Sequence, residues 1–269
     1  MSNHNYNYRD NNFRFEQTGD YTLLMQIAPA SFSYAITEGK KLLVWEENHP
    51  LNELSSEEEE GDLLSQPFKS VVIGLPNSGF TLIPASLYNA DKLTDLAKFL
   101  DVKPNEQVLW QPLDAENYVI YKVDQGITSL VTSKFSLEHA IFAPQGWISA
   151  IAGNNPTHLY LNTDDDKAEL LYYKDGRLRF YNIFEFKNAD ELVYFVSVVA
   201  LELQLNPHSV TLIVSGDIKL DDKNGKRLAE FFDKVELNNL QILELPEQIV
   251  SHPLLALTAL SLCGSSEVY

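Results

Sequence analysis

Apolar and polar positions along the first part of the chain follow a pattern typical of β-strands. An apolar run covers 23–27, an alternating pattern covers 32–36, and a second apolar run covers 42–45 after the turn Glu38-Gly39-Lys40. Alternation with a period of two indicates strands, and glycine readily adopts the backbone conformations of tight turns. The pattern therefore predicts a three-stranded meander over 22–47.

The same pattern returns in the second half of the chain. Apolar runs cover 159–161, 170–173 and 178–181, and the turn Lys174-Asp175-Gly176-Arg177 joins the last two. The turn glycines Gly39 and Gly176 lie 137 residues apart, which is about half of the 269 residues. We therefore expect two related halves and not an array of short repeats.

The remainder of the first half mixes strands with helices. Apolar segments at 71–75 and 81–84 flank a Pro-Asn-Ser-Gly turn and predict two strands. An amphipathic helix is predicted over 91–100, then a strand pair over 108–113 and 118–123. A helix ending near Ala152 follows, although Pro144 and Gly146 interrupt its pattern.

In the second half the meander is followed by alternating helices and strands. Asn188 is a candidate N-cap for a helix over 190–205, whose apolar residues cover most of its circumference and predict burial on nearly all sides. The later patterns predict a strand over 211–217, a helix over 225–235, a strand over 240–245 and a helix over 253–262. This order predicts an α/β fold in which each half has a mixed sheet with helices on its faces and the two halves leave a cleft between them.

These patterns divide the chain into three parts. Residues 1–20 form a polar N-terminal arm, 21–155 a first lobe and 156–269 a second lobe. Within the first lobe, 54–62 is a run of acidic residues, which we expect to be a solvated loop.

Composition narrows the classes of function. The formal charge of −18 and the pI of about 4.6 argue against binding to nucleic acid or to an anionic membrane surface. The single cysteine, Cys263, excludes an intrachain disulfide and a thiolate zinc site. No apolar leader and no run of about 18 apolar residues occurs, so we expect a cytoplasmic protein. We also expect the protein to be a monomer or a weak dimer.

The order of elements, present twice, resembles the plan of the actin-like ATPase superfamily, which has a ribonuclease H-like fold. This superfamily includes actin, the seventy-kilodalton heat-shock chaperones, sugar kinases and the ATPase-fold proteins of type IV pilus assembly. The stretch DGRLRFYNIFEFKNADELVYFVSVVALELQL (175–205), with the N-terminal meander, is similar to an uncharacterised bacterial family of unknown function assigned to this fold.

The resemblance implies where phosphates and a metal ion would bind, namely the turn between the first two strands of each half. In the first half these positions are Ile27, Ala28, Pro29 and Ala30, which offer neither a carboxylate nor a glycine. In the second half they run from Asn162 to Asp166 and include a candidate metal-linked Asp164, again without glycine. The glycine pair expected at the adenosine-binding turn is reduced to Ser215-Gly216-Asp217.

The candidate cofactor-binding residues are therefore remnants: Asp164, Asp166, Ser215 and Gly216. The carboxylates of 164–166 could hold Mg²⁺ or Ca²⁺, but a hydrophilic hairpin turn explains them more simply. The six histidines show no ligand spacing, and no catalytic residue or metal ligand is assigned.

Three functions stay open. The favoured hypothesis is a non-catalytic protein with a degenerate actin-like fold, which binds an unknown protein partner or acts as a scaffold and needs no cofactor. The alternative is an ATPase or kinase that binds ATP and Mg²⁺ through Asp164 or Asp166 and the backbone at Gly216. A third is a module that holds another protein through an exposed edge strand or the cleft.

Overall fold

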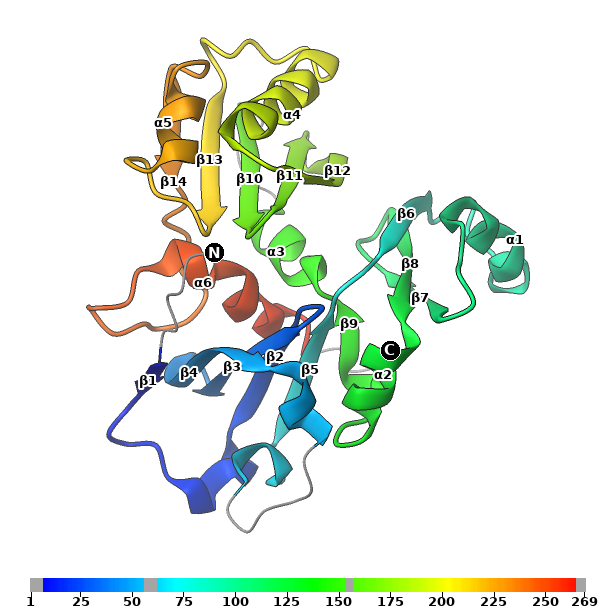
Figure 1. Ribbon diagram of the computed structural model, residues 1–269, viewed down its shortest axis with the longest axis vertical. Helices are drawn as coiled ribbons and strands as arrows, with labels where there is room; N and C mark the ends of the chain where they lie inside the picture. Colours follow the sequence, from blue (N-terminus) through cyan, green and yellow to red (C-terminus); the bar gives the residue numbers. More distant parts are fainter. Residues whose placement is uncertain (1–6, 56–61, 153–156, 265–269) are drawn as a thin grey trace. The chain divides into compact units, whose positions relative to one another are not determined.

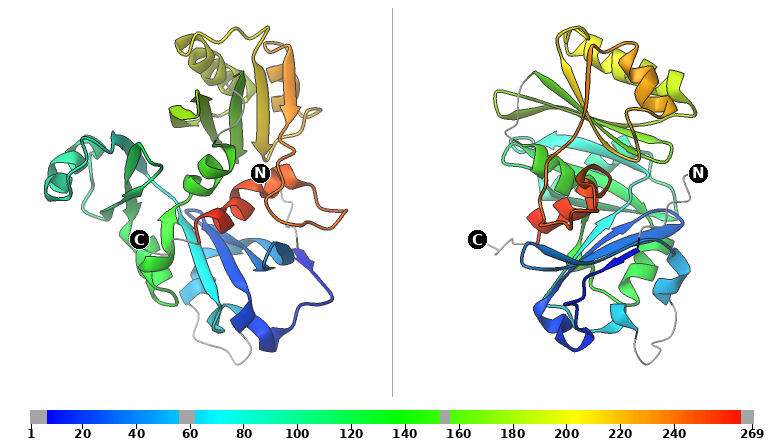
Figure 2. Two further views of the ribbon diagram at one scale, coloured as in Figure 1. Left: turned by 180° about the vertical axis from the view of Figure 1, so that it is seen from behind. Right: turned by 90° about the vertical axis from the view of Figure 1, so that its left-hand side faces the viewer.

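The computed structural model describes residues 7–55, 62–152 and 157–264. The chain forms two compact units (Figures 1 and 2). The N-terminal unit is built on Asn5–Ser149 together with Leu257–Tyr269, and the C-terminal unit on Ala150–Ala256. The predicted lobes placed the whole end of the chain in the second lobe, whereas residues 257–264 group with the N-terminal unit.

The N-terminal unit contains a six-stranded sheet in the order β1-β4-β3-β2-β5-β9 (Figure 1). Its strands are β1 (Asn7–Arg9), β2 (Thr22–Ile27), β3 (Ser31–Glu38), β4 (Lys41–Pro50), β5 (Ser70–Leu75) and β9 (Ala140–Phe142). The predicted meander forms β2 to β4, which pair antiparallel, and β5 and β9 add in parallel. Because β1 pairs with β4, part of the segment predicted as a polar arm belongs to the sheet.

A second, three-stranded sheet is inserted after β5; we call it the insert sheet. It consists of β6 (Gly79–Pro84), β7 (Glu106–Pro112) and β8 (Asn117–Asp124) in the order β6-β8-β7. The predicted strand pair is the antiparallel hairpin of β7 and β8. The helix predicted over 91–100 contains only one short α-helical segment, α1 (Leu93–Ala97), with 3-10 turns on either side. Asp101, in the left-handed region at φ 48°, ends it.

Two further helices of this region are α2 (Gln125–Thr132) and α3 (Pro144–Ile151). Pro144 is the first residue of α3, where the missing N–H costs no helical hydrogen bond. Gly146 lies against α6 (Ser251–Ala259), and a Cβ on Gly146 would be 2.7 Å from the carbonyl carbon of Ala259. The two residues that interrupt the helical pattern are therefore explained by a helix start and a close helix contact.

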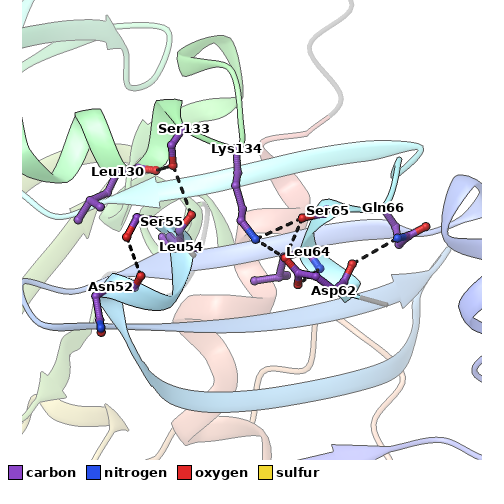
Figure 3. Close-up of polar contacts among 10 residues, drawn as sticks. All are labelled: Asn52, Leu54, Ser55, Asp62, Leu64, Ser65, Gln66, Leu130, Ser133 and Lys134. Atoms are coloured by element: carbon purple, nitrogen blue, oxygen red, sulfur yellow. Dashed lines mark hydrogen bonds and ion pairs between the residues drawn. The ribbon is translucent and has the colours of Figure 1, made fainter. Parts of the chain in front are cut away.

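The acidic segment 54–62 is held at both ends by the end of α2 (Figure 3). Ser133 donates a hydrogen bond to the carbonyl oxygen of Leu54 at 3.3 Å, and Lys134 pairs with Asp62. Burial alone would raise the pKa of Asp62, but hydrogen bonds from Lys134, Ser65 and the Leu64 amide outweigh it and lower that pKa. The middle of the predicted loop, 56–61, lies outside the described residues.

The C-terminal unit contains a five-stranded sheet in the order β12-β11-β10-β13-β14. Its strands are β10 (His158–Asp164), β11 (Lys167–Lys174), β12 (Arg177–Glu185), β13 (Thr211–Gly216) and β14 (Lys234–Leu237). The first four repeat the pairing of β4-β3-β2-β5, with two antiparallel pairs and one parallel pair. The strand predicted over 240–245 is wrong: the free edge of β13 is taken by β14, which lies where the sequence pattern predicted the end of a helix.

Helices α4 (Ala189–Glu202) and α5 (Lys223–Ala229) lie together on one face of this sheet (Figures 1 and 2). Asn188 caps α4 as predicted, because its side chain accepts hydrogen bonds from the amides of Asp190 and Glu191. The core beneath these helices is apolar and fully buried; it includes Leu161, Leu170, Leu212, Val214, Leu192, Val196 and Leu228. Each such side chain contributes about 1.5–3 kcal/mol by its removal from water.

Candidate functional site

The three consecutive aspartates lie at the hairpin between β10 and β11. Asp164 is the last residue of β10 and pairs with Lys167, so Asp165 and Asp166 form the turn. All three are exposed, and Asp165 adopts the left-handed conformation (φ 51°) that aspartate tolerates well. Among the described residues, no group of three or more His, Cys, Asp or Glu side chains is arranged to hold a metal ion.

Ser215 and Gly216 end β13, in parallel register with Asn162 and Thr163 of β10. Gly216 has φ +83°, and a Cβ at this position would lie 1.9 Å from the carbonyl oxygen of Thr163. A glycine is therefore required here by the contact between two strands of the unit itself. Its presence does not depend on a nucleotide.

A row of buried polar side chains crosses the carboxyl ends of β10, β13 and β14. We call it the polar row; it consists of Asn162, Ser215 and Asn238. Asn162 pairs with Ser215, and the amide of Asn238 donates to the carbonyl of Val214 at 2.8 Å. Asn162 Oδ1, Ser215 Oγ and Asn238 Nδ2 have no hydrogen-bond partner among the described residues. Buried polar atoms of this kind are costly unless water or a ligand meets them.

His252, near the start of α6, adds another buried polar group to this region. It hydrogen-bonds to the backbone of Gly216, and burial lowers the pKa of the imidazole, which favours its neutral form. The carboxyl ends of parallel strands are where α/β folds commonly bind ligands. The structure thus brings Ser215 and Gly216 together with Asn238 and His252, which the sequence patterns did not single out.

Glu169 of β11 lies opposite Asn162 and accepts a hydrogen bond from the Tyr181 hydroxyl at 2.9 Å. Burial raises the pKa of Glu169 to about 7, since the hydrogen bond from Tyr181 only partly offsets the loss of hydration. A carboxyl group that titrates near neutral pH is common at functional sites and also in purely structural clusters. The sequence offered one signal for it, a glutamate inside an otherwise apolar strand.

These residues do not fit an ATP–Mg²⁺ complex well. The turn after β10 contains no glycine, so the backbone cannot approach phosphates as closely as in a glycine-rich turn. The charges acting on Asp164 are those of Asp165, Asp166 and Asp217, opposed by Lys167, which leaves the turn net negative. These carboxylates would repel a triphosphate, and a bound cation would first have to compensate their negative charge.

The N-terminal unit contains a different kind of site, a hollow of about 380 Å³ that we call the edge hollow. It lies between β7, the edge of the insert sheet, and β9, the edge of the six-stranded sheet. Four consecutive residues of β7, Leu109 to Pro112, line it together with Ala140 and Ile141 of β9. The side chains of consecutive strand residues point to opposite faces of a sheet. Since all four consecutive residues line the hollow, the hollow runs along the edge of β7 and not over one face of the sheet.

The backbone of β7 offers hydrogen-bonding groups to this hollow. Leu113 donates its amide to Asn117 at 2.9 Å on the β8 side, whereas the carbonyl of Pro112 accepts from Gln145 at 3.3 Å on the opposite side. Since the direction of backbone groups alternates along a strand, the amide and carbonyl of Trp110 point away from β8 toward the hollow. An exposed strand edge of this kind can pair with another extended chain.

Gln111 connects the two sheets across the hollow. Its Oε1 accepts hydrogen bonds from the Phe142 amide at 2.9 Å and from the Tyr121 hydroxyl at 3.2 Å, and its amide group donates to Gln145. The outward amide of β9 is thereby satisfied within the chain. Of the two strand edges at this hollow, that of β7 keeps the outward-facing backbone of Trp110.

Aromatic rings lie beside this edge. Trp110 is 42% exposed and its ring centroid lies 5.1 Å from that of Tyr88. Tyr88 in turn stacks on Tyr118 at 3.9 Å with an interplanar angle of 6°. Partly exposed aromatic side chains held by packing are typical anchors of protein interfaces.

Comparisons with known proteins agree with this architecture. Residues 10–235 match the family model described as "Protein of unknown function (DUF3822)". The chain belongs to this family. A search of the curated proteins finds no match.

Solved structures show the fold of this DUF3822 chain. A Bacteroides thetaiotaomicron VPI-5482 protein, described as having an actin-like ATPase fold and unknown function, is similar with a TM-score of 0.72 and 20% identity, over 85% of this chain and 95% of that one. A structure described as the PilM–PilN type IV pilus biogenesis complex is similar with a TM-score of 0.58 and 12% identity, over 90% of this chain and 98% of that one. The predicted actin-like fold is confirmed.

Within the described residues, no helix is both long and apolar enough to cross a membrane.

Proposed function

We propose that this DUF3822 chain is a non-catalytic cytoplasmic protein that binds a partner protein and acts as a scaffold. The observation that carries the proposal is the edge hollow, where the backbone of Trp110 faces a space lined by Leu109, Ala140 and Ile141. The occupant that fits it is an extended segment of the partner with apolar side chains.

Strand addition explains how such a segment would be held. Its backbone would pair with the outward amide and carbonyl of Trp110, and alternate side chains would enter the hollow, where Leu109 and Ile141 offer apolar contacts. Pro112 at the end of β7 has no N–H to donate, which limits the edge and protects it from unspecific pairing. The similarity to a structure described as a PilM–PilN complex supports a binding role for this fold, at the level of the fold alone.

A pull-down with matched variants tests the proposal. Trp110→Ala truncates the aromatic residue at the edge hollow, and Phe99→Ala truncates an exposed aromatic residue that does not line it. Quantitative mass spectrometry of extract from the source organism should find a protein retained by the wild type and by Phe99→Ala. Its retention by Trp110→Ala should fall by about tenfold or more. Equal retention by the two variants would contradict the proposal.

The alternative is an atypical nucleotide-binding protein that uses Asp164 or Asp166 with Mg²⁺. The observation that favours it is the polar row, whose Asn162 Oδ1 and Ser215 Oγ lack partners among the described residues. Calorimetry with ATP–Mg²⁺ at millimolar concentration tests it directly. We expect no binding; ATP hydrolysis that falls in Asp164→Ala would establish the alternative and end the scaffold proposal in its non-catalytic form.

A further inference from the structure

Helix α4 has an exposed apolar stripe, although its sequence pattern predicts burial on nearly all sides. That prediction is wrong for Val198, which is 37% exposed, and for Leu201, which is 73% exposed; Tyr194 is 62% exposed as well. Their spacing of four and then three residues places them on one face of the helix. We call these three residues the α4 stripe.

The opposite face of α4 is used by the fold. Leu192, Val196 and Val199 lie in the core against the C-terminal sheet. The α4 stripe is therefore additional to the apolar surface that this helix needs in order to pack. Exposed apolar residues gathered on one face, in contrast to single ones, mark interaction surfaces.

The charges beside the stripe are acidic. Helix α4 contains Asp190, Glu191 and Glu202 and no Lys or Arg. On the neighbouring helix α5, Arg227 pairs with Asp190 at 2.7 Å and also with Glu230. The stripe is thus flanked by carboxylates whose charge is only partly compensated.

This charge pattern selects among possible occupants. A second copy of the chain would bring the same carboxylates against themselves, in a protein whose formal charge is already −18. An anionic lipid surface would be repelled for the same reason. A helix with an apolar stripe and basic flanks matches both the spacing and the sign of the charge.

We propose that the α4 stripe is a docking site for a basic amphipathic helix of a partner protein. The stripe spans eight residues, from Tyr194 to Leu201, which is about 10 Å of helix or two turns. A contact of this length buries one small cluster of side chains. Its affinity is therefore weak and depends strongly on Leu201, the most exposed member of the stripe.

The test uses two designed peptides of about 18 residues, five helical turns, with leucines at helical spacing. One has lysine flanks and the other has glutamate flanks. Each is dye-labelled and titrated with the full chain, and fluorescence anisotropy reports binding. The variant is Leu201→Gln, and the matched control is Leu87→Gln, since Leu87 is 71% exposed and lies in the other unit.

The wild type and Leu87→Gln should bind the lysine-flanked peptide equally, and Leu201→Gln should bind it about tenfold more weakly. The glutamate-flanked peptide should not bind. Raising the salt from about 0.05 M to about 0.5 M should weaken binding several-fold, because the flanking charges are exposed.

Three results would overturn the proposal. One is equal binding of the lysine-flanked peptide by Leu201→Gln and Leu87→Gln, or no binding by any of the proteins. Another is a dimer, seen by analytical ultracentrifugation, that Leu201→Gln dissociates, which would make a second copy the occupant. The third is binding of the wild type, but not of Leu201→Gln, to vesicles of phosphatidylcholine and phosphatidylserine.

Discussion

The central parallel strands of the two units end in different surroundings. In the N-terminal sheet Gly74 of β5 lies beside Gln26 of β2, and a Cβ on Gly74 would be 3.1 Å from Ala143 and 3.4 Å from Leu260. Apolar packing closes this end. In the C-terminal sheet the corresponding strands end at the polar row, where buried polar atoms have no partner among the described residues.

This comparison shows that the same strand order can place side chains of different chemistry at the ends of its central strands. Both sheets have two antiparallel pairs followed by a parallel pair. This shared strand order therefore determines neither the apolar packing at the end of the N-terminal sheet nor the polar row at the end of the C-terminal sheet. The edge hollow of the N-terminal unit lies elsewhere, at the edge of β7, which belongs to the insert sheet. Function therefore depends on the residues at each site and not on the shared fold.

The largest expected effect is a difference in the free energy of unfolding between alanine substitutions at Gly216 and at Gly74. Gly216→Ala should lower the free energy of unfolding by about 3 kcal/mol or more, because it combines a positive φ with a Cβ 1.9 Å from the Thr163 carbonyl. Gly74→Ala should cost about 1 kcal/mol, because its contacts at 3.1 Å require only small shifts. Urea unfolding measures both, and equal losses would contradict the difference drawn between the two strand ends.

A second difference concerns the buried carboxyl of the C-terminal unit. The pKa of Glu169 is raised by burial to about 7, above its ordinary value of 4.5, so the folded state binds an extra proton between these values. The contribution of Glu169 to the free energy of unfolding is therefore fully present below pH 4.5, and it is lost as the pH rises through 7. Glu169→Gln should thus be more stable than the wild type by about 3 kcal/mol at high pH and equal to it in acid.

Unfolding of the wild type and of Glu169→Gln across the pH range checks this expectation. A constant difference at all pH values would show that the substitution acts through packing. The hydroxyl of Tyr181, which donates to Glu169, can pair with the amide oxygen of glutamine in the same place.

The N-terminal unit contains a carboxyl with the opposite shift. The Lys103 amide at 2.8 Å, with Ser78 and Lys122, lowers the pKa of Glu106 to about 2 from 4.5. Its contribution to stability is complete above pH 4.5 and is lost as the pH falls toward 2.

Glu106→Gln should therefore lower the thermal midpoint at pH 7, because it leaves the ammonium group of Lys122 without its carboxylate at 3.0 Å. The deficit should shrink steadily between pH 4.5 and 2. A deficit that grows in acid would contradict the assigned shift. Together, Glu106→Gln and Glu169→Gln should tilt the pH profile in opposite directions.

The smallest expected effect concerns the link between the two sheets of the N-terminal unit. Gln111→Leu removes the acceptor of the Phe142 amide and should cost about 1 kcal/mol. Partner binding at the edge hollow should weaken as well, since Gln111 joins β7 to β9 across it. Unfolding and pull-down of the same variant measure the two effects, and wild-type behaviour in both would show that Gln111 does not connect the sheets.

The meanders could be predicted from the sequence because alternation and turn glycines are local signals. Gly39 and Gly176 both occupy the predicted turns with positive φ. The shortest strands could not be predicted: β9 has three residues and β14 has four. Each forms a strand because it pairs with a longer neighbour, β9 with β5 and β14 with β13. Their existence depends on a free neighbouring edge, which no local pattern reports.

The candidate site could be predicted only in part, for the same reason. Ser215 and Gly216 end β13, but the polar row also contains Asn238, which reaches it through the pairing of β14. The edge hollow depends on how the insert sheet meets β9, and only the position of Pro112 at a strand end hinted at an edge. The binding role of Asp164 and Asp166, and the absence of a cofactor, stay predictions.

Hydrogen–deuterium exchange tests the central claim most directly. The full chain would be measured alone and with the partner isolated by the wild-type bait. We predict that the Trp110 amide exchanges quickly in the free protein and is protected in the complex, while exchange at Ser215 to Asp217 stays unchanged. A complex in which Trp110 exchanges as fast as in the free protein, or protection at Ser215 to Asp217 on addition of ATP–Mg²⁺ alone, would contradict it.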